Sequence, residues 1–494
     1  MSQQPSPGTI LGHPNALWML FMTEFWERFC YYGMRAILGP YVAITFFAHL
    51  GDGAAAEASL TYGGYTSMVY MTGILGGYIA DRILGYQRSI LLGGAMMATG
   101  MFMLLAPDLV TFLLGLAVIV VGNGLFKPNI STMVGRLYAP GDARRDSGFT
   151  IFYMGINAGA FFAPLVCGMW IGATYGYKWG FFAAGIGMVI GTLVFQLRKG
   201  CLGSNGATPE GQEGKGGANL LKVLIGSLVL IAPVYVLLSK SEVLGGLLVI
   251  MMLGLTGYFI YSGIHSQSKE QLHRYIAMLI LFVANMCFWA LFEQAGSSLN
   301  FFARDYVSMP VLPLIGEVNF TAFQSANPIF ILLLAPLFAA LWPKLDQINA
   351  NPSIPRKFAF GLLGVGVGFY VLVFAIQFLQ GADGRVPWEM LALCYLIHTM
   401  GELCLSPIGL SMVTKLARPH EVGLAMGGWF LSTATANYMA GRIAAIATGG
   451  HGEAAGSIAG YLTVFNQLFW VGLAIAALFF VTAPLVNKLM HGIK

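Results

Sequence analysis

The chain has 494 residues, of which 57% are hydrophobic and 10% are charged. With a mean hydropathy of +0.72, this composition excludes a soluble domain and predicts an all-α integral membrane protein with many spans. The net charge of +5 does not indicate a nucleic-acid partner, because the basic residues follow the membrane topology derived below. The six cysteines suggest neither a disulfide framework nor a metal site, and no cofactor is expected.

Fourteen segments are apolar and long enough to cross the ~30 Å hydrocarbon core of a bilayer. In chain order they are residues 15–38, 62–81, 89–106, 109–134, 148–171, 177–197, 219–239, 243–264, 275–294, 320–342, 357–380, 387–411, 421–447 and 458–487. If both termini are cytoplasmic, most of the 26 Lys and Arg residues fall in inside loops and tails. We therefore expect a multi-pass protein of the inner (plasma) membrane with both termini in the cytoplasm.

The first predicted span carries four charged residues. Glu24, Glu27 and Arg28 lie at positions i, i+3 and i+4 and share one helix face, and Arg35 falls on nearly the same face. A charge at the centre of a spanning helix costs roughly 2.5–3.5 kcal/mol on insertion scales. The segment therefore indicates a functional role for these side chains.

Four further charges are predicted within spans, namely Lys127, Glu293, Glu402 and Arg442. Arg442 lies near the outer end of its span and is expected to snorkel toward the surface. The structural alternative for the others is static ion pairing between helices. Buried static pairs stabilise a protein poorly compared with apolar packing, so their accumulation favours a functional polar cavity.

A flexible linker divides the predicted spans. Residues 198–218 are rich in Gly and polar residues, which predicts a cytoplasmic linker after a first six-helix bundle at 15–197. The pair at 219–264 has no charge expected within the bilayer and is interpreted as structural, outside any transport path. Residues 275–487 then form a second six-helix bundle.

The loop after the second span contains a glycine, acid and base pattern. It runs Gly76-Gly77-Tyr78-Ile79-Ala80-Asp81-Arg82 and continues to Arg88. It resembles the cytoplasmic loop motif of the major facilitator superfamily, in which an Asp at a helix end meets a neighbouring helix terminus and Arg groups. The simpler alternative is a positive-inside loop with a glycine turn.

Five segments resemble motifs of the proton-dependent oligopeptide transporter (POT/PTR) family, in its bacterial branch. They are Glu24-x-x-Glu27-Arg28-Phe29, Lys127-Pro128-Asn129, the stretch from Phe149 to Phe161 with Gly155-Ile156-Asn157-Ala158-Gly159, Phe323-Gln324-Ser325-Ala326-Asn327-Pro328 and Gly401-Glu402-Leu403-Cys404-Leu405-Ser406-Pro407. They follow in the expected order from about residue 17 to residue 440. The resemblance implies the major facilitator superfamily fold, with two six-helix bundles and two inserted helices.

The resemblance also implies roles for individual residues. Proton coupling is implied for Glu24, Glu27, Arg28, Lys127 and Glu293. A carboxyl whose basic partner comes and goes with conformation can bind and release a proton, which is what this role requires.

For a zwitterionic peptide, the resemblance implies Arg35 and Lys127 as partners of the carboxylate. It implies Glu402, Asn157 and Asn327 as partners of the ammonium group. The side chains expected to line the same pocket are Tyr31, Tyr70, Trp289, Trp429 and Ser432.

Two gate pairs are implied as well. Arg35 with Glu293 would close the outer side, and Lys127 with Glu402 would close the inner side. The chain departs from some relatives at Phe292, where these have a second acid beside Glu293, so the proton number stays open. His398 is interpreted as a packed or pore-rim histidine.

The sequence therefore predicts a non-enzymatic secondary transporter that takes up di- and tripeptides with protons, embedded in the bilayer as a monomer. No phosphate-binding loop of the Gly-x-x-x-x-Gly-Lys-Ser/Thr type is present in the sequence, which argues against ATP as the energy source. One alternative is the same fold carrying another solute, such as nitrate or a drug-like compound, with antiport as one option for its coupling. A second alternative is a channel or membrane receptor.

Overall fold

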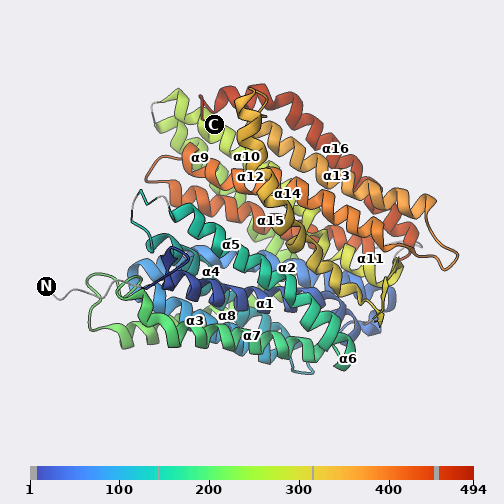
Figure 1. Cartoon of the computed structure of the whole chain (residues 1–494), viewed down its shortest axis with the longest axis horizontal. Coiled ribbons are helices and arrows are strands. Elements are labelled where there is room, and N and C mark those ends of the chain that lie inside the picture. Colours follow the sequence, from blue (N-terminus) through green and yellow to red (C-terminus); the bar gives the residue numbers. More distant parts are fainter. Residues whose placement is uncertain are drawn as a thin grey trace. The chain divides into compact units, whose positions relative to one another are not determined.

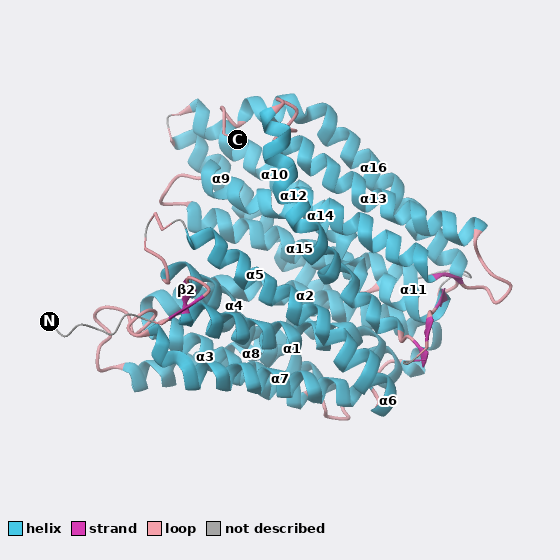
Figure 2. Cartoon of the chain, in the orientation of Figure 1, coloured by secondary structure: helices cyan, strands magenta, loops and turns pink. Residues whose placement is uncertain are grey.

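The computed structural model describes residues 8–139, 141–142, 144–266, 268–313, 316–449 and 456–493. Helices make up most of this part of the chain, and the strands within it are two residues long (Figure 2). These strands pair as β1 (Thr9–Ile10) with β2 (His13–Pro14), β3 (Val307–Ser308) with β6 (Val386–Pro387), and β4 (Val311–Leu312) with β5 (Gly316–Glu317).

The helices follow one another through short connections, and Figure 1 labels most of them. Their bounds are α1 Asn15–Thr45, α2 Ala54–Ile79, α3 Tyr86–Met103, α4 Leu109–Arg136, α5 Arg144–Ala163, α6 Ala173–Tyr175, α7 Tyr177–Arg198, α8 Gly216–Ser239, α9 Ser241–His265, α10 Lys269–Phe292, α11 Ser298–Tyr306, α12 Ala326–Gln347, α13 Ile354–Phe378, α14 Trp388–Leu416, α15 Val422–Gly449 and α16 Ile458–Leu489. Shorter turns of 3-10 helix lie at Ala48–Gly53, Lys199–Leu202, Glu293–Gly296 and Phe320–Ser325, and π-helical turns lie at Ala80–Leu84 and Pro164–Gly172.

Each of the fourteen predicted spans coincides with helix, which confirms the all-α membrane fold. Ten helical segments of the described chain are long and apolar enough to cross a membrane by length and composition. The first helix, α1, is not among them because its four charged side chains lower its hydropathy. The charges for which a functional role is predicted therefore also lower the hydropathy of the span that carries them.

The chain divides into two compact units. Unit 1 comprises Met1–Ile37 and Met71–Ser239, and unit 2 comprises Leu38–Tyr70 and Lys240–Lys494. The inserted pair is divided between them: α8 belongs to unit 1 and α9 to unit 2, with only Lys240 separating the two helices. The boundaries of the two six-helix bundles stay a prediction.

Small residues allow the helices of unit 1 to pack closely. Helix α4 packs along α3 and also contacts α8, and α3 contacts α7. At the α3–α4 crossing, a Cβ added to Gly100 would lie 2.7 Å from the carbonyl oxygen of Gly115. Such close backbone approach is typical of membrane helices, where small residues replace the hydrophobic driving force available in water.

Small residues also allow close helix packing in unit 2. Helix α13 packs against α14 and α16, while α10 packs against α15 and α9. The first part of α2 crosses α15 at two glycines: a Cβ added to Gly441 would lie 2.8 Å from the Cα of Gly63 and 2.9 Å from the carbonyl oxygen of Ser59. Both neighbours are backbone atoms, so the crossing has no flexible side chain that could yield.

Replacement of Gly441 by alanine should therefore destabilise the protein. We expect overpacking to cost about 1–3 kcal/mol, seen as a lower melting temperature of the purified protein in detergent. Gly423→Ala on the same helix is the control, because an added Cβ there has nothing within 4 Å. Equal melting temperatures for the two variants would contradict the close crossing.

Candidate functional site

Helix α1 and helix α4 bring together a buried cluster of charges in unit 1. Lys127 of α4 pairs with Oε1 of Glu24, and Arg28 Nε lies 3.4 Å from the same oxygen. Arg28 also forms a two-pronged ion pair with Glu27, in which its Nη2 donates to Oε1 at 2.6 Å. Glu24 and Glu27 are 0% exposed and Arg28 is 8% exposed, so these three side chains are almost wholly shielded from solvent, whereas the side chain of Lys127 is partly exposed.

The two carboxylates of the cluster differ in their partners. Both oxygens of Glu27 accept hydrogen bonds from Arg28, and Asn123 Nδ2 also donates to Oε1 at 3.4 Å. In Glu24, Oε1 is shared by two cations, whereas Oε2 is buried and has no hydrogen-bond partner among the described residues. A buried acceptor without a donor is costly, so Glu24 is the less well satisfied of the two carboxylates.

Aromatic rings line the next turns of α1. The guanidinium carbon of Arg28 lies 5.0 Å from the ring centre of Tyr31 and 5.9 Å from that of Tyr32. The guanidinium carbon of Arg35 also lies near the Tyr32 ring, 5.7 Å from its centre. Cation–π contact stabilises an arginine that is removed from water, so the ring of Tyr32 serves both cations of this helix face.

The glycines of the fifth-span motif explain how α5 reaches the cluster. A Cβ on Gly159 would lie 2.3 Å from the carbonyl oxygen of Phe25 and 3.0 Å from the Cβ of Arg28, and a Cβ on Gly155 would meet the ring of Phe21 at 2.8 Å. Helix α5 therefore packs directly on the face of α1 that bears the charges. Between the glycines, Asn157 is 4% exposed and donates to the carbonyl of Tyr153 at 3.0 Å.

The loop motif after the second span forms a small polar centre of its own. Asp81, in the π-helical turn, accepts a hydrogen bond from the phenol of Tyr86. The guanidinium carbon of Arg136 lies 4.4 Å from the centre of the Tyr86 ring, and its Nη2 donates to the phenol oxygen at 3.4 Å. The acid at the helix end is thus linked to an arginine of α4 through a tyrosine, a link that the sequence pattern did not include.

In unit 2, the predicted ammonium-binding residues lie together. The side-chain amide of Asn327 in α12 donates to Glu402 Oε2 in α14 at 2.7 Å and to Thr399 Oγ1 at 3.1 Å. Glu402 is 8% exposed. The structure therefore joins the tenth-span and twelfth-span motifs in one carboxylate–amide pair.

The other predicted residues of unit 2 occupy different environments. Glu293 is 3% exposed and begins the turn that follows α10, and Trp289 packs edge-on against Phe288 and Phe292 one turn earlier. Tyr70 lies on α2 and is half-buried. His398 is buried and its Nε2 lies 3.0 Å from the carbonyl oxygen of Val365, as befits a packed histidine.

Trp429 and Ser432 lie deeper in the packing of α15. Trp429 is 5% exposed, and its ring fills the space beside Gly409, where an added Cβ would lie 2.1 Å away. Ser432 is 0% exposed, accepts from Asn285 at 2.8 Å and donates to the carbonyl of Trp429 at 2.7 Å. The hydroxyl of Ser432 thus already donates and accepts a hydrogen bond within the protein.

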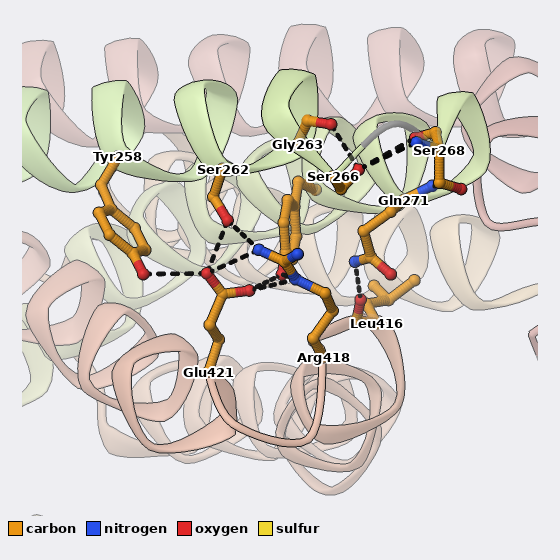
Figure 3. A network of polar contacts seen from close by, with 10 residues as sticks. Tyr258, Ser262, Gly263, Ser266, Ser268, Gln271, Leu416, Arg418 and Glu421 are labelled. Atoms are coloured by element: carbon orange, nitrogen blue, oxygen red, sulfur yellow. Dashed lines mark hydrogen bonds and ion pairs between the residues drawn. The ribbon is translucent and has the colours of Figure 1, made fainter.

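A second polar cluster, centred on Glu421, was not predicted. Glu421 lies in the turn between α14 and α15 and is 3% exposed. Arg418 in the same turn donates to Glu421 Oε2 at 2.8 Å and to Oε1 at 3.1 Å (Figure 3). Across from the turn, Tyr258 and Ser262 of α9 donate to Oε1 at 2.9 and 2.6 Å, and Tyr275 of α10 donates to Oε2.

This Glu421 cluster fastens the inserted helix α9 to unit 2. Tyr258 and Ser262 are four residues apart and therefore share the face of α9 that meets the turn. Their spacing on an otherwise apolar helix was the available signal, together with the Arg-x-x-Glu spacing of Arg418 and Glu421.

Comparison with known proteins places the chain in a family. The sequence model of the POT family matches residues 87–459. The chain belongs to the POT family. Members of the family are transporters, so the protein is a membrane transporter rather than an enzyme.

Individual relatives cover almost the whole chain. It is 38% identical to the peptide transporter YePEPT of Yersinia enterocolitica, over 91% of this chain and 90% of that protein. It is 30% identical to the dipeptide and tripeptide permease B of Salmonella typhimurium, over 98% of each. A solved peptide transporter POT in complex with sulfate matches with a TM-score of 0.83 at 36% identity, covering 98% of both chains.

Two further solved structures contain bound small molecules. A mutant of peptide transporter POT in complex with alafosfalin matches with a TM-score of 0.82 at 36% identity, over 98% of this chain and 97% of that chain. A POT family transporter in complex with 5-aminolevulinic acid matches with a TM-score of 0.80 at 31% identity, over 97% and 98%. The predicted major facilitator superfamily fold is thereby confirmed.

The pKa of Glu421 is shifted by its surroundings. Burial raises it, but the hydrogen bonds from Arg418, Ser262, Tyr275 and Tyr258 outweigh burial and lower the pKa from 4.5 to about 2. The same pairing raises the pKa of Arg418. A lowered native pKa means that ionised Glu421 stabilises the fold above pH 4.5, and that this contribution is lost as the pH falls toward 2.

Substitution Glu421→Gln should lower the stability of the protein by roughly 1.5–3 kcal/mol, the range for hydrogen bonds to a charged group. Thermal unfolding in detergent at neutral pH measures the loss. Glu270→Gln is the matched control, because Glu270 is 49% exposed in its pair with Arg274 and such pairs contribute about 0–1 kcal/mol. The difference between wild type and Glu421→Gln should also shrink as the pH falls below 4.5. A difference that is constant with pH would contradict the ionised state of Glu421.

Proposed function

We propose that this protein takes up di- and tripeptides into the cytoplasm by proton-coupled symport, through alternating access. The observation that carries the proposal is the environment of the Glu24 carboxylate. Lys127 and Arg28 share its Oε1, and its buried Oε2 has no donor among the residues that the structure describes. The names of relatives that cover nearly the whole chain support peptides as the solute. The positive-inside bias supports cytoplasmic termini.

Proton coupling follows from the competition for Glu24. When Glu24 is ionised, its charge attracts Lys127, whose side chain is 31% exposed and is the most accessible member of the cluster. A proton on Glu24 removes that attraction and frees the ammonium group of Lys127 for another anion. The carboxylate of a peptide is such an anion, so proton binding and substrate binding favour one another.

The peptide ends require opposite partners. We infer that Arg35 and Lys127 of unit 1 bind the carboxylate, and that the Glu402–Asn327 pair of unit 2 binds the ammonium group, with Asn157 contributing an amide. Tyr31, Tyr70 and Trp289 supply apolar surface for side chains of different size. Glu293 is proposed as a further protonation site. The pairs Arg35–Glu293 and Lys127–Glu402 are proposed as gates on grounds of charge alone.

A second candidate solute is a small amino acid analogue. A solved relative at 31% identity binds 5-aminolevulinic acid, which has an amino group and an acid group but no peptide bond. The Glu402–Asn327 pair would accept that amino group equally well. Competition between a radiolabelled dipeptide and 5-aminolevulinic acid in proteoliposomes separates the two solutes.

Glu24→Gln should abolish uptake driven by an inward proton gradient while leaving some peptide exchange, because the amide cannot take up the proton but preserves the shape of the site. Radiolabelled dipeptide uptake and counterflow in proteoliposomes measure the two activities. Arg35→Ala should impair both, since it removes a partner of the substrate. Glu57→Gln, at an exposed acid of α2, is the control and should change neither. Gradient-driven accumulation by Glu24→Gln would rule out Glu24 as a coupling residue.

The proposed outer gate is tested by charge exchange. Arg35→Glu and Glu293→Arg should each reduce uptake strongly, because each places two like charges at the gate. The double variant should recover part of the activity if the residues pair in the transport cycle. Uptake by the double variant no higher than that of the singles would exclude this gate.

A further inference from the structure

Helices α2, α4 and α8 of unit 1 enclose an apolar groove of about 370 Å³. Its walls are formed by aliphatic side chains, among them Leu75 and Ile79 of α2, Leu125 of α4 and Leu230 of α8. The volume lies in the range of pockets that hold small organic ligands. The residues that line the groove include no acid, so it lacks a partner for the ammonium group of a peptide.

Glycines explain why the groove exists. At its floor, a Cβ on Gly76 would lie 1.7 Å from the carbonyl oxygen of Gly124, so α2 and α4 touch there without side chains between them. On the opposite wall, Gly226 of α8 has nothing within 4 Å of an added Cβ. The space in front of Gly226 is therefore open, although α8 runs alongside α4.

One end of the groove is polar and positively charged. Lys222 lines it one helical turn before Gly226, on the same face of α8, and Tyr78 of α2 lines it with its side chain 65% exposed. Asn219 closes this end by donating to the carbonyl of Ile83 at 3.2 Å. Arg88 lies near the start of α8, against Gly216. The positive-inside rule places this end at the cytoplasmic surface.

We propose that the groove binds an anionic phospholipid of the cytoplasmic leaflet. One acyl chain would lie along the aliphatic walls in front of Gly226, and the headgroup phosphate would meet the ammonium group of Lys222 and the phenol of Tyr78. A zwitterionic headgroup would bring its own cation toward Lys222, which gives the site its preference for a net negative lipid. Burial of acyl methylenes supplies the binding energy that does not depend on charge.

The neighbouring surface of α8 also indicates a lipid rather than a protein partner. Leu221, Ile225 and Leu228 of α8, a helix apolar enough to cross a membrane, are each more than half exposed. Lipid chains already cover such a surface in a membrane, and the groove is a recess in it that can hold one chain in place. The bound lipid would fill the space that α8 leaves against α2 and α4. The interpretation of the inserted helices as purely structural would then be incomplete for α8.

The test compares phosphatidylglycerol with phosphatidylcholine of the same acyl chains, added to the purified full-length protein in detergent. Native mass spectrometry counts retained lipid, and thermal unfolding measures stabilisation. We expect the wild type to retain phosphatidylglycerol about fivefold better than phosphatidylcholine, because the choline cation offsets the attraction of about 1 kcal/mol that Lys222 exerts on a lipid of net negative charge. Lys222→Gln should bring the two lipids to equal binding.

A second variant tests the groove itself. Gly226→Phe should extend a ring into the groove from a position where an added Cβ has nothing within 4 Å, and should reduce binding of both lipids while the variant stays folded. The matched controls are Lys240→Gln, beyond the other end of α8, and Gly257→Phe on α9, where an added Cβ also has nothing within 4 Å. Both controls should bind as the wild type does.

Three results would overturn the proposal. The first is an unchanged lipid preference in Lys222→Gln, and the second is unchanged phosphatidylglycerol binding in Gly226→Phe. The third is displacement of phosphatidylglycerol by palmitate at equal concentration, which would show a site for a free acyl chain in place of a phospholipid. Because none of these readouts involves transport, the result is independent of the proposed peptide symport.

Discussion

Burial of charge in α1 is the constraint on which the rest of this structure depends. Glu24, Glu27 and Arg28 are removed from solvent in a helix that must lie in a bilayer, and each charge there needs a partner. The chain meets this need within one helix and from α4, through Lys127 and Asn123. One carboxylate oxygen, Oε2 of Glu24, has no hydrogen-bond partner within the described part of the chain, and the proposed proton coupling rests on this carboxylate.

Close packing around the cluster follows from the same constraint. Gly155 and Gly159 let α5 approach α1 so closely that a methyl group would not fit at Gly159, and this contact shields the ion pairs from lipid and water. The low dielectric that results strengthens the attraction between paired charges and raises the cost of an unpaired one. A glycine motif and a charge motif on different helices therefore serve one purpose.

The two inserted helices differ more than their similar composition indicates. Helix α9 is held to unit 2 by the hydroxyls of Tyr258 and Ser262 on Glu421. Helix α8 belongs to unit 1, where Asn219 donates to the carbonyl of Ile83 in the π-helical turn after α2 and an apolar groove lies beside α4. Each inserted helix is thus attached to its own unit.

The sequence by itself determined the number of spans, the charged face of α1 and the family. These depend on the length of apolar segments, on i, i+3 and i+4 spacing, and on local motifs, each of which can be read from a short stretch of sequence. Only the tertiary structure decided the partners of the buried polar groups. Oε2 of Glu24 has no hydrogen-bond partner among the described residues, Asn285 donates to the hydroxyl of Ser432, and side chains of α9 and α10 donate to Glu421. The physical reason is that these partners come from helices far apart in the chain, and no local pattern states which helices are neighbours.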